Sequence, residues 1–150
     1  MKIFKFLNFL FLLLLMIACS EAEQENVYVD PDHEIPDYQN LEWINSDPIS
    51  IGESLGNGEI VLIDFWTYTC VNCIRTFPFL NEWNQKYKDD GLKIIGVHTP
   101  EFEFEKVKKN IIKSVKKNSL EYPIVLDNDF EIWDEFKNRY WPAKYLFNTK

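Results

Sequence analysis

The chain has 150 residues, of which 46% are hydrophobic and 27% are charged, so it can bury the core of one globular domain. Its formal net charge is −8, which argues against nucleic acid as a partner, because phosphate binding needs a basic surface. The sequence has no nucleotide-binding glycine pattern, and Gly52, Gly56 and Gly58 are most simply explained by a turn before a strand.

The first 18 residues predict a signal peptide. Lys2 and Lys5 precede an apolar run, Phe6–Ala18, of about 13 residues, which is shorter than the ~20 that a membrane span needs. The sequence "LLMIACS" that closes this run resembles the bacterial lipobox, in which a cysteine receives lipid after cleavage, and Cys19 is the matching residue. The alternative is an ordinary signal peptide that leaves Cys19 as a free thiol.

Residues 19–40 predict an acidic linker that would hold a domain away from a membrane. The segment 20–40 contains seven acids and two prolines, a composition typical of a solvated tether. His33 is isolated in this segment and is expected to be solvated. The domain is expected to span residues 41–150, and "EWINSDPISI" near its start predicts a small hairpin or an edge strand.

The rest of the chain alternates between strands and helices. Dense apolar runs predict buried strands at 59–66, 92–99, 122–127 and 143–148. Helical spacing predicts a helix from Val71 to about Tyr87, kinked at Pro78, and a short helix at 130–138.

A further amphipathic helix is predicted at about 103–118. Four of its apolar side chains are expected to face the core: Phe104, Val107, Ile111 and Val115. The alternation of strands and helices predicts an α/β fold with a mainly parallel sheet.

Cys70 and Cys73 stand in "DFWTYTCVNC", where the strand at 59–66 gives way to a helix. Backbone N–H groups and the helix dipole stabilise a thiolate in the first turn of a helix, so the pKa of Cys70 is expected to be low. The spacing of three residues brings the second sulfur close enough to form a disulfide. We therefore expect Cys70 to be the exposed, attacking sulfur and Cys73 to lie one turn deeper.

Asp64 lies inside the apolar strand, where an ionised carboxylate is costly. Burial would raise its pKa and make it a proton acceptor for the cysteine pair. The alternative is a solvated aspartate at the end of a strand. Because Ile63 and Phe65 flank it, we favour the buried position.

These residues carry a family resemblance. "VLIDFWTYTCVNC" and the residues just after it resemble the thioredoxin superfamily in three respects. Asp64 stands six positions before the first cysteine, Phe65–Trp66 directly follow that aspartate, and Pro78 stands five positions beyond the second cysteine. The phrases "GVHTPEFEFEK" and "RYWPAKYLF" are similar to its TlpA-like branch, and specifically to the DipZ-like subgroup. The resemblance extends from about Trp43 to Phe147.

The resemblance implies a thioredoxin-like three-layer fold and a thiol-disulfide oxidoreductase without a cofactor. Pro142 matches the family's cis-proline beside the cysteines, where Trp141 and Trp66 would help to bind substrate. Cys70 would attack a protein disulfide, and Cys73 with Asp64 would resolve the mixed disulfide. The expected partners are protein disulfides and a membrane thiol electron donor, at the periplasm-facing side of a bacterial envelope.

The sequence departs from the family at its end. Thioredoxin folds continue with one more strand and a C-terminal helix, and both are expected to be missing here, leaving "KYLF" as an exposed edge. This keeps open an inactive fragment or a partner-completed binding module.

Two other chemistries remain possible from the sequence. Thr67 and Cys70 match part of a peroxiredoxin-type Thr-x-x-Cys, which would make the protein a thiol peroxidase. A zinc site would need the two cysteines together with His98 and His33, because tetrahedral zinc takes four ligands, and no metal site is expected.

Overall fold

The computed structural model of the protein describes residues 38–148. The predicted signal peptide, the lipidation at Cys19 and the linker up to residue 37 lie outside the described residues. The linker was expected to reach residue 40, but Tyr38 already packs into the hydrophobic core. Between residues 38 and 148, no helix is long and apolar enough to cross a membrane.

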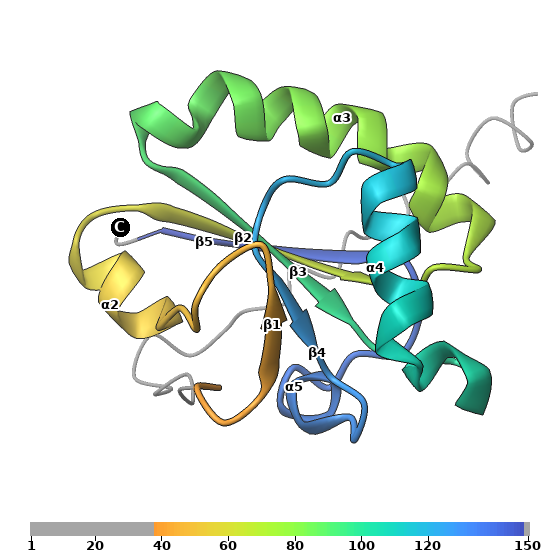
Figure 1. Ribbon diagram of the computed structural model, residues 1–150. Helices are drawn as coiled ribbons and strands as arrows, with labels where there is room; N and C mark the ends of the chain where they lie inside the picture. Colours follow the sequence, from red (N-terminus) through yellow and green to blue (C-terminus); the bar gives the residue numbers. More distant parts are fainter. Residues whose placement is uncertain (1–37, 149–150) are drawn as a thin grey trace, which may run out of the picture. The chain divides into compact units, whose positions relative to one another are not determined.

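A five-stranded mixed sheet forms the centre of the fold (Figure 1). In chain order its strands are β1 (Glu42–Ile44), β2 (Ile60–Trp66), β3 (Leu92–His98), β4 (Ile124–Leu126) and β5 (Ala143–Phe147). Their order across the sheet is β1-β4-β3-β2-β5, with parallel pairing in the central β4-β3-β2 and antiparallel pairing of β1 and β5 at the two edges. The central strands are parallel because each is joined to the next by a crossover helix. The prediction of β1 as an edge strand is confirmed.

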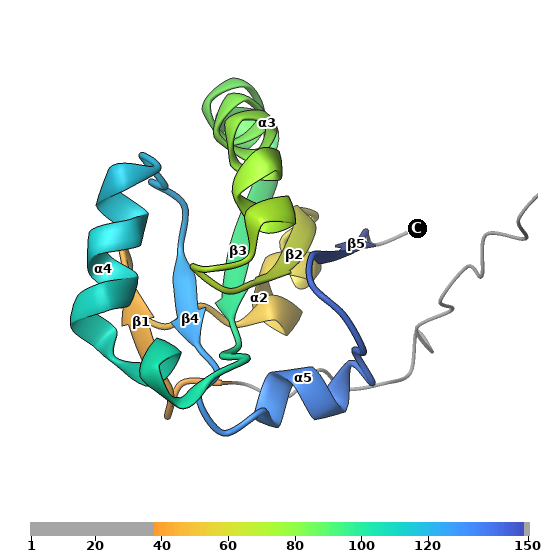
Figure 2. The same ribbon diagram turned by 90° about the vertical axis from the view of Figure 1, so that its right-hand side faces the viewer.

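Helices cover both faces of the sheet, which gives the predicted three layers (Figures 1 and 2). Helices α3 (Val71–Tyr87) and α4 (Lys108–Lys117) pack on one face, and α2 (Ile51–Gly56) and α5 (Glu131–Glu135) pack on the other. A short 3₁₀ helix, η1 (Lys88–Asp90), follows α3. The thioredoxin-like fold class predicted from the sequence is confirmed.

The alternation of side chains along β2 decides which face of the sheet Asp64 occupies. Successive side chains of a strand point to opposite faces, so Leu62 and Trp66 pack beneath α3, whereas Ile63 and Phe65 pack on the α5 side. Both faces are covered, which accounts for the continuous apolar run. Asp64 shares the parity of Leu62 and Trp66 and therefore lies on the α3 face, with the cysteine-bearing helix.

The glycine-rich segment before β2 differs from the prediction. Gly52 and Gly56, assigned to a turn from the sequence, lie in the short helix α2. The Ser50 hydroxyl accepts a hydrogen bond from the N–H of Glu53 at 3.2 Å and so caps the start of this helix. Gly58 does adopt the turn conformation, with a positive φ of 81°.

The helix predicted at 103–118 is broken into two pieces, η2 (Glu103–Lys106) and α4, with an extended residue, Val107, between them. Ile111 and Val115 are buried as predicted, but Phe104 and Val107 are 54% and 49% exposed. The inward orientation expected for the latter two is therefore wrong. The physical reason is a hydrogen-bonded loop around Glu105, which ends the helical periodicity before α4 begins.

Candidate active site

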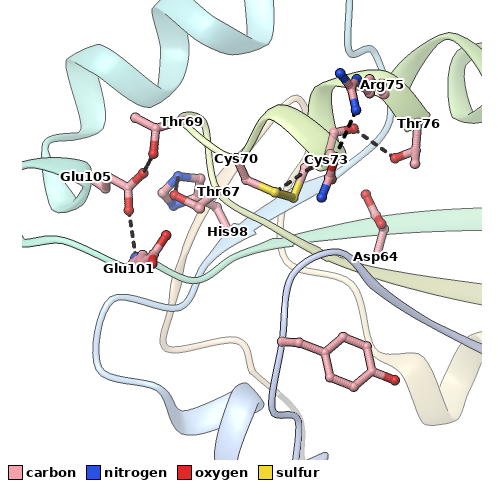
Figure 3. Close-up of a disulfide and its surroundings, with 12 residues drawn as sticks. Asp64, Thr67, Thr69, Cys70, Cys73, Arg75, Thr76, His98, Glu101 and Glu105 are labelled. Atoms are coloured by element: carbon pink, nitrogen blue, oxygen red, sulfur yellow. Dashed lines mark hydrogen bonds between the residues drawn. A yellow bond between two sulfur atoms is a disulfide. The ribbon is translucent and has the colours of Figure 1, made fainter.

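Cys70 and Cys73 form a disulfide at the start of α3 (Figure 3). Cys70 is the N-cap residue, and its Sγ accepts a hydrogen bond from the backbone N–H of Cys73 at 3.1 Å. Cys70 is partly exposed, whereas Cys73 is fully buried against the core. The predicted placement of an accessible first sulfur and a deeper second sulfur is confirmed, and the Cys73 N–H that reaches the Cys70 sulfur is suited to stabilising a thiolate there.

Asp64 is fully buried on β2, as expected, and points toward the first turn of α3 (Figure 3). Lys144 Nζ lies 2.8 Å from its Oδ1, and among the described residues no hydrogen bond of good geometry reaches either carboxylate oxygen. Burial raises the pKa of Asp64 to about 6, although the charge of Lys144 acts in the opposite direction. The buried position of Asp64 is confirmed, and its role as a proton acceptor stays a prediction.

Lys144 is a residue that sequence reasoning missed. It lies directly opposite Asp64 in the register of β5 with β2, and its ammonium also donates to Thr76 Oγ1 at 3.3 Å. The Thr76 hydroxyl in turn donates to the carbonyl oxygen of Cys73 at 2.9 Å. Lys144 therefore links the buried carboxylate to the first turn of α3. The available signal was a lone lysine within the apolar segment "AKYLF".

The assignment of Trp66 to the substrate-binding surface is wrong. Trp66 is fully buried, and its ring packs edge-on against Phe77 and His98. On β3, Gly96 leaves the space that the indole occupies, since a Cβ at this position would lie 3.0 Å from Trp66 Nε1. Trp66 is a core residue beneath the active site and cannot contact a substrate.

The Trp141–Pro142 peptide bond is cis, as the resemblance implied. Pro142 lines an open groove of about 480 Å³ together with Thr76, Tyr140 and Lys144. The centroids of the Trp141 and Trp133 rings lie 4.2 Å apart, and the two ring planes are tilted by 35°. Contact of Trp141 and Pro142 with a substrate stays a prediction.

Asp127 fixes the position of Trp133, the neighbour of Trp141. Its carboxylate accepts the backbone N–H groups of Ile132 and Trp133, each at 3.0 Å, and the Thr99 hydroxyl at 2.9 Å. These bonds begin α5 at the end of β4, and so they hold the tryptophan pair beside the cis-proline loop.

Each residue of the loop that precedes Cys70, 67–69, contacts either the last residue of β3 or the segment that follows it. Thr67 Oγ1 lies 3.4 Å from His98 Nε2, and the Tyr68 hydroxyl donates to the Phe104 carbonyl oxygen at 3.2 Å. The Thr69 hydroxyl donates to Oε1 of Glu105 (Figure 3). Cys70 therefore follows a loop with little freedom to move.

Glu105 is the centre of this network. Its Oε2 accepts the backbone N–H groups of Glu101 and Phe102 at 2.6 and 3.0 Å, and its side chain is fully buried. Burial opposes ionisation, but hydrogen bonds from Thr69, Thr67 and these backbone groups outweigh it and lower the pKa of the Glu105 carboxyl below its usual value. Sequence reasoning placed Glu105 in a helix and gave it no role.

His98 ends β3, and its Nε2 lies 3.4 Å from the Thr67 hydroxyl. The ring is fully buried against Trp66 and Tyr68, and burial lowers its pKa to about 4. The buried Thr67 hydroxyl faces this ring, which gives no support to a Thr-x-x-Cys peroxidase site. Within the described part of the chain, no group of three or more His, Cys, Asp or Glu side chains could hold a metal ion.

The chain is similar to known proteins in both sequence and structure. Residues 57–150 match a family described as thioredoxin-like. The thiol-disulfide oxidoreductase YkuV of Bacillus subtilis is 32% identical over 106 residues, which cover 71% of this chain and 70% of that protein. This chain belongs to the thioredoxin-like family. A solution structure of a thioredoxin-like protein in the oxidised form is 31% identical, with a TM-score of 0.65, over 71% of this chain and 70% of that one.

Protein DipZ of Mycobacterium tuberculosis is 49% identical over 110 residues, which are 71% of this chain but 16% of that much longer protein. The similarity to DipZ agrees with the subgroup that the sequence motifs indicated. The predicted family, and with it a thioredoxin-like oxidoreductase domain, is confirmed.

Proposed function

We propose that this protein reduces disulfides in polypeptide substrates through Cys70 and Cys73. The observation that carries the proposal is the placement of the pair: a partly exposed Sγ at the N-cap of α3, a buried partner sulfur, and a buried carboxylate beneath the same helix. The relative YkuV of Bacillus subtilis is a thiol-disulfide oxidoreductase, which supports the same chemistry.

In the first step the reduced protein supplies the electrons. The Cys70 thiolate, stabilised by the Cys73 N–H, attacks one sulfur of the substrate disulfide. A new bond forms between Cys70 and that sulfur, the substrate S–S bond breaks, and the second substrate sulfur leaves as a thiolate.

In the second step the buried Cys73 thiol transfers its proton to the Asp64 carboxylate and attacks the Cys70 sulfur. The Cys70–Cys73 disulfide forms, the mixed disulfide breaks, and the substrate leaves as a dithiol after it takes up protons. Two electrons pass to the substrate in total. A dithiol donor at the membrane must then reduce the Cys70–Cys73 disulfide before another cycle.

The same proposal includes the location of the protein. Residues 1–18 act as a signal peptide, Cys19 carries lipid, and the residues from Cys19 up to the folded domain, which already includes Tyr38, tether it to a membrane of the bacterial envelope. The basic start, the apolar run and the lipobox-like "LLMIACS" support this arrangement.

The test follows the two cysteines separately. Cys73→Ser should accumulate a mixed disulfide with a disulfide-bonded peptide, whereas Cys70→Ser should form none, as measured by mass spectrometry after acid quenching. In intact cells an alkylating mass tag should find the pair mostly reduced. A pair that is mostly oxidised in cells would contradict the reductase and favour an oxidant, and adduct formation by Cys70→Ser would contradict the assigned nucleophile.

A further inference from the structure

Two phenylalanine rings project from the loop between β3 and α4. Phe102 and Phe104 are 50% and 54% exposed, and their rings stack with centroids 5.5 Å apart and planes within 5° of parallel. Exposed aromatic side chains that are held together in this way present a flat apolar surface to the solvent.

This aromatic pair contacts the loop that leads into the nucleophile. The Tyr68 hydroxyl, two positions before Cys70, donates to the Phe104 carbonyl oxygen, and the Tyr68 ring contacts the Phe104 ring edge-on with centroids 6.4 Å apart. Val71, directly after Cys70, is 60% exposed. Apolar side chains therefore lie on the loop before Cys70 and at the residue directly after it. Glu105, which bonds to the same loop, lies across the disulfide from Asp64 (Figure 3).

The protein uses a buried charge to hold the two rings outward. Glu105 accepts the N–H of Phe102 and the hydroxyl of Thr69, so one carboxylate fixes both the aromatic pair and the loop that carries Cys70. A continuous amphipathic helix over this segment would have turned Phe104 toward the core, as the sequence pattern predicted. The observed loop instead exposes it beside Tyr68, in the loop that leads to Cys70.

We propose that Phe102 and Phe104 bind apolar side chains that flank the target disulfide of a polypeptide substrate. This inference rests on the proposed function and gives it a substrate class. Glu101 and Glu103 are exposed in the same segment, and Glu103 is paired with Lys106 at 2.9 Å. The carboxylate of Glu101 is adjacent to Phe102 in the chain, so an apolar segment followed by a basic residue complements this surface better than an acidic one.

The experiment measures kcat/KM for two disulfide-bonded peptides that differ only in flanking residues, one with Leu and Phe followed by Lys, the other with Ser and Gly followed by Lys. The wild-type protein should prefer the apolar peptide by about 10-fold, mainly through KM. Phe102→Ser/Phe104→Ser should lose most of that preference, and Phe102→Leu/Phe104→Leu, which keeps an apolar surface, should retain most of it.

The matched control is Ile60→Thr/Leu146→Thr, which replaces two other exposed apolar side chains on the sheet and should keep the wild-type preference. Equal kcat/KM for the two peptides in the wild type, or an unchanged preference in the Ser variant, would overturn the inference while leaving the proposed function intact. If the reduced protein transfers no electrons to either peptide or to hydroxyethyl disulfide, the proposed function itself fails, and the inference fails with it.

Discussion

Asp64 and Glu105 are two fully buried carboxylates on opposite sides of one disulfide, yet their environments differ (Figure 3). Glu105, on the Cys70 side, accepts two backbone N–H groups and the hydroxyl of Thr69. Asp64, on the Cys73 side, has an ion pair with Lys144 and no well-formed hydrogen bond from the described residues. The pKa of Glu105 is therefore lowered, and that of Asp64 is raised to about 6.

The comparison shows that burial alone does not decide the state of a carboxylate. Burial raises the pKa in both places, and the number of donors determines whether that effect is outweighed. A carboxyl with few donors and a pKa near neutrality can take up and release a proton, which suits Asp64 to catalysis. A carboxylate with several donors stays ionised and holds structure, which suits Glu105 to positioning the Cys70 loop.

The largest expected effect is on the chemistry at Asp64. Asp64→Asn removes the proton acceptor for Cys73, so resolution of the mixed disulfide at pH 7 should slow by about 100-fold, within the usual range for general base catalysis. Rapid-quench measurements of the mixed disulfide check this, because the intermediate should accumulate while its formation slows much less. Equal slowing of both steps would mean that Asp64 acts on the fold or on Cys70, and not as the base for Cys73.

The second prediction concerns the pH dependence of stability in the oxidised protein. The folded pKa of Asp64, about 6, lies above the ordinary value of 3.8, so folded molecules keep a proton that unfolded ones lose. This carboxyl should therefore lower the free energy of unfolding by about 3 kcal/mol in total as the pH rises from about 3 to about 7, with most of the fall between the two pKa values. Urea unfolding across this range should show that fall, and Asp64→Asn should lack it.

Glu105 should show the opposite sign. Its folded pKa lies below that of the unfolded chain, so it contributes stability above its ordinary pKa and loses that contribution as the pH falls through the folded value. Unfolding of Glu105→Gln should therefore differ most from wild type near neutrality and least in acid. If the loss of unfolding free energy in Glu105→Gln grew as the pH fell, the pKa of Glu105 would not be lowered in the folded protein, and the contrast with Asp64 would be wrong.

The third prediction is the loss of stability on removing Glu105. Glu105→Ala leaves the N–H of Phe102 and the hydroxyl of Thr69 without their acceptor, which should cost about 2 kcal/mol in the free energy of unfolding at pH 7. The matched control is Glu103→Ala in the same loop, where an exposed ion pair with Lys106 at 2.9 Å should contribute well under about 1 kcal/mol. Similar losses of unfolding free energy in the two variants would show that the buried hydrogen bonds of Glu105 stabilise the fold no more than an exposed ion pair does.

Much of the site could be predicted from the sequence because its signals are local. The position of Cys70 at a strand–helix junction and the burial of Asp64 both follow from the residues on either side. The split of the 103–118 helix could not be predicted, because it depends on Glu105 contacting Thr69, which is 36 positions away. Trp66 was misassigned for a related reason: only the packing of Gly96 and Phe77 around it shows that it is core.

Lys144 could not be found from the sequence, because only the register of β5 with β2 places it opposite Asp64. Its substitution is expected to have the smallest effect among the tests of the contrast between Asp64 and Glu105. Lys144→Met removes the positive charge 2.8 Å from Asp64, so the pKa of Asp64 should rise further, by about one pH unit. A carboxyl-carbon NMR titration of the oxidised protein measures this directly, and the pH profile of mixed-disulfide resolution should move in the same direction. Lys144→Arg should keep most of the wild-type pKa.

Lys93 on β3 offers a matched control for this test, since it pairs with Glu59 at the same 2.8 Å but in a partly exposed position. Lys93→Met should leave the titration of Asp64 unchanged. If Lys144→Met also leaves it unchanged, the ion pair does not moderate the pKa of Asp64, and desolvation alone would have to account for the contrast with Glu105. A rise in the pKa of Asp64 in Lys144→Met but not in Lys93→Met would show that the ammonium of Lys144 on β5 limits how far burial raises that pKa.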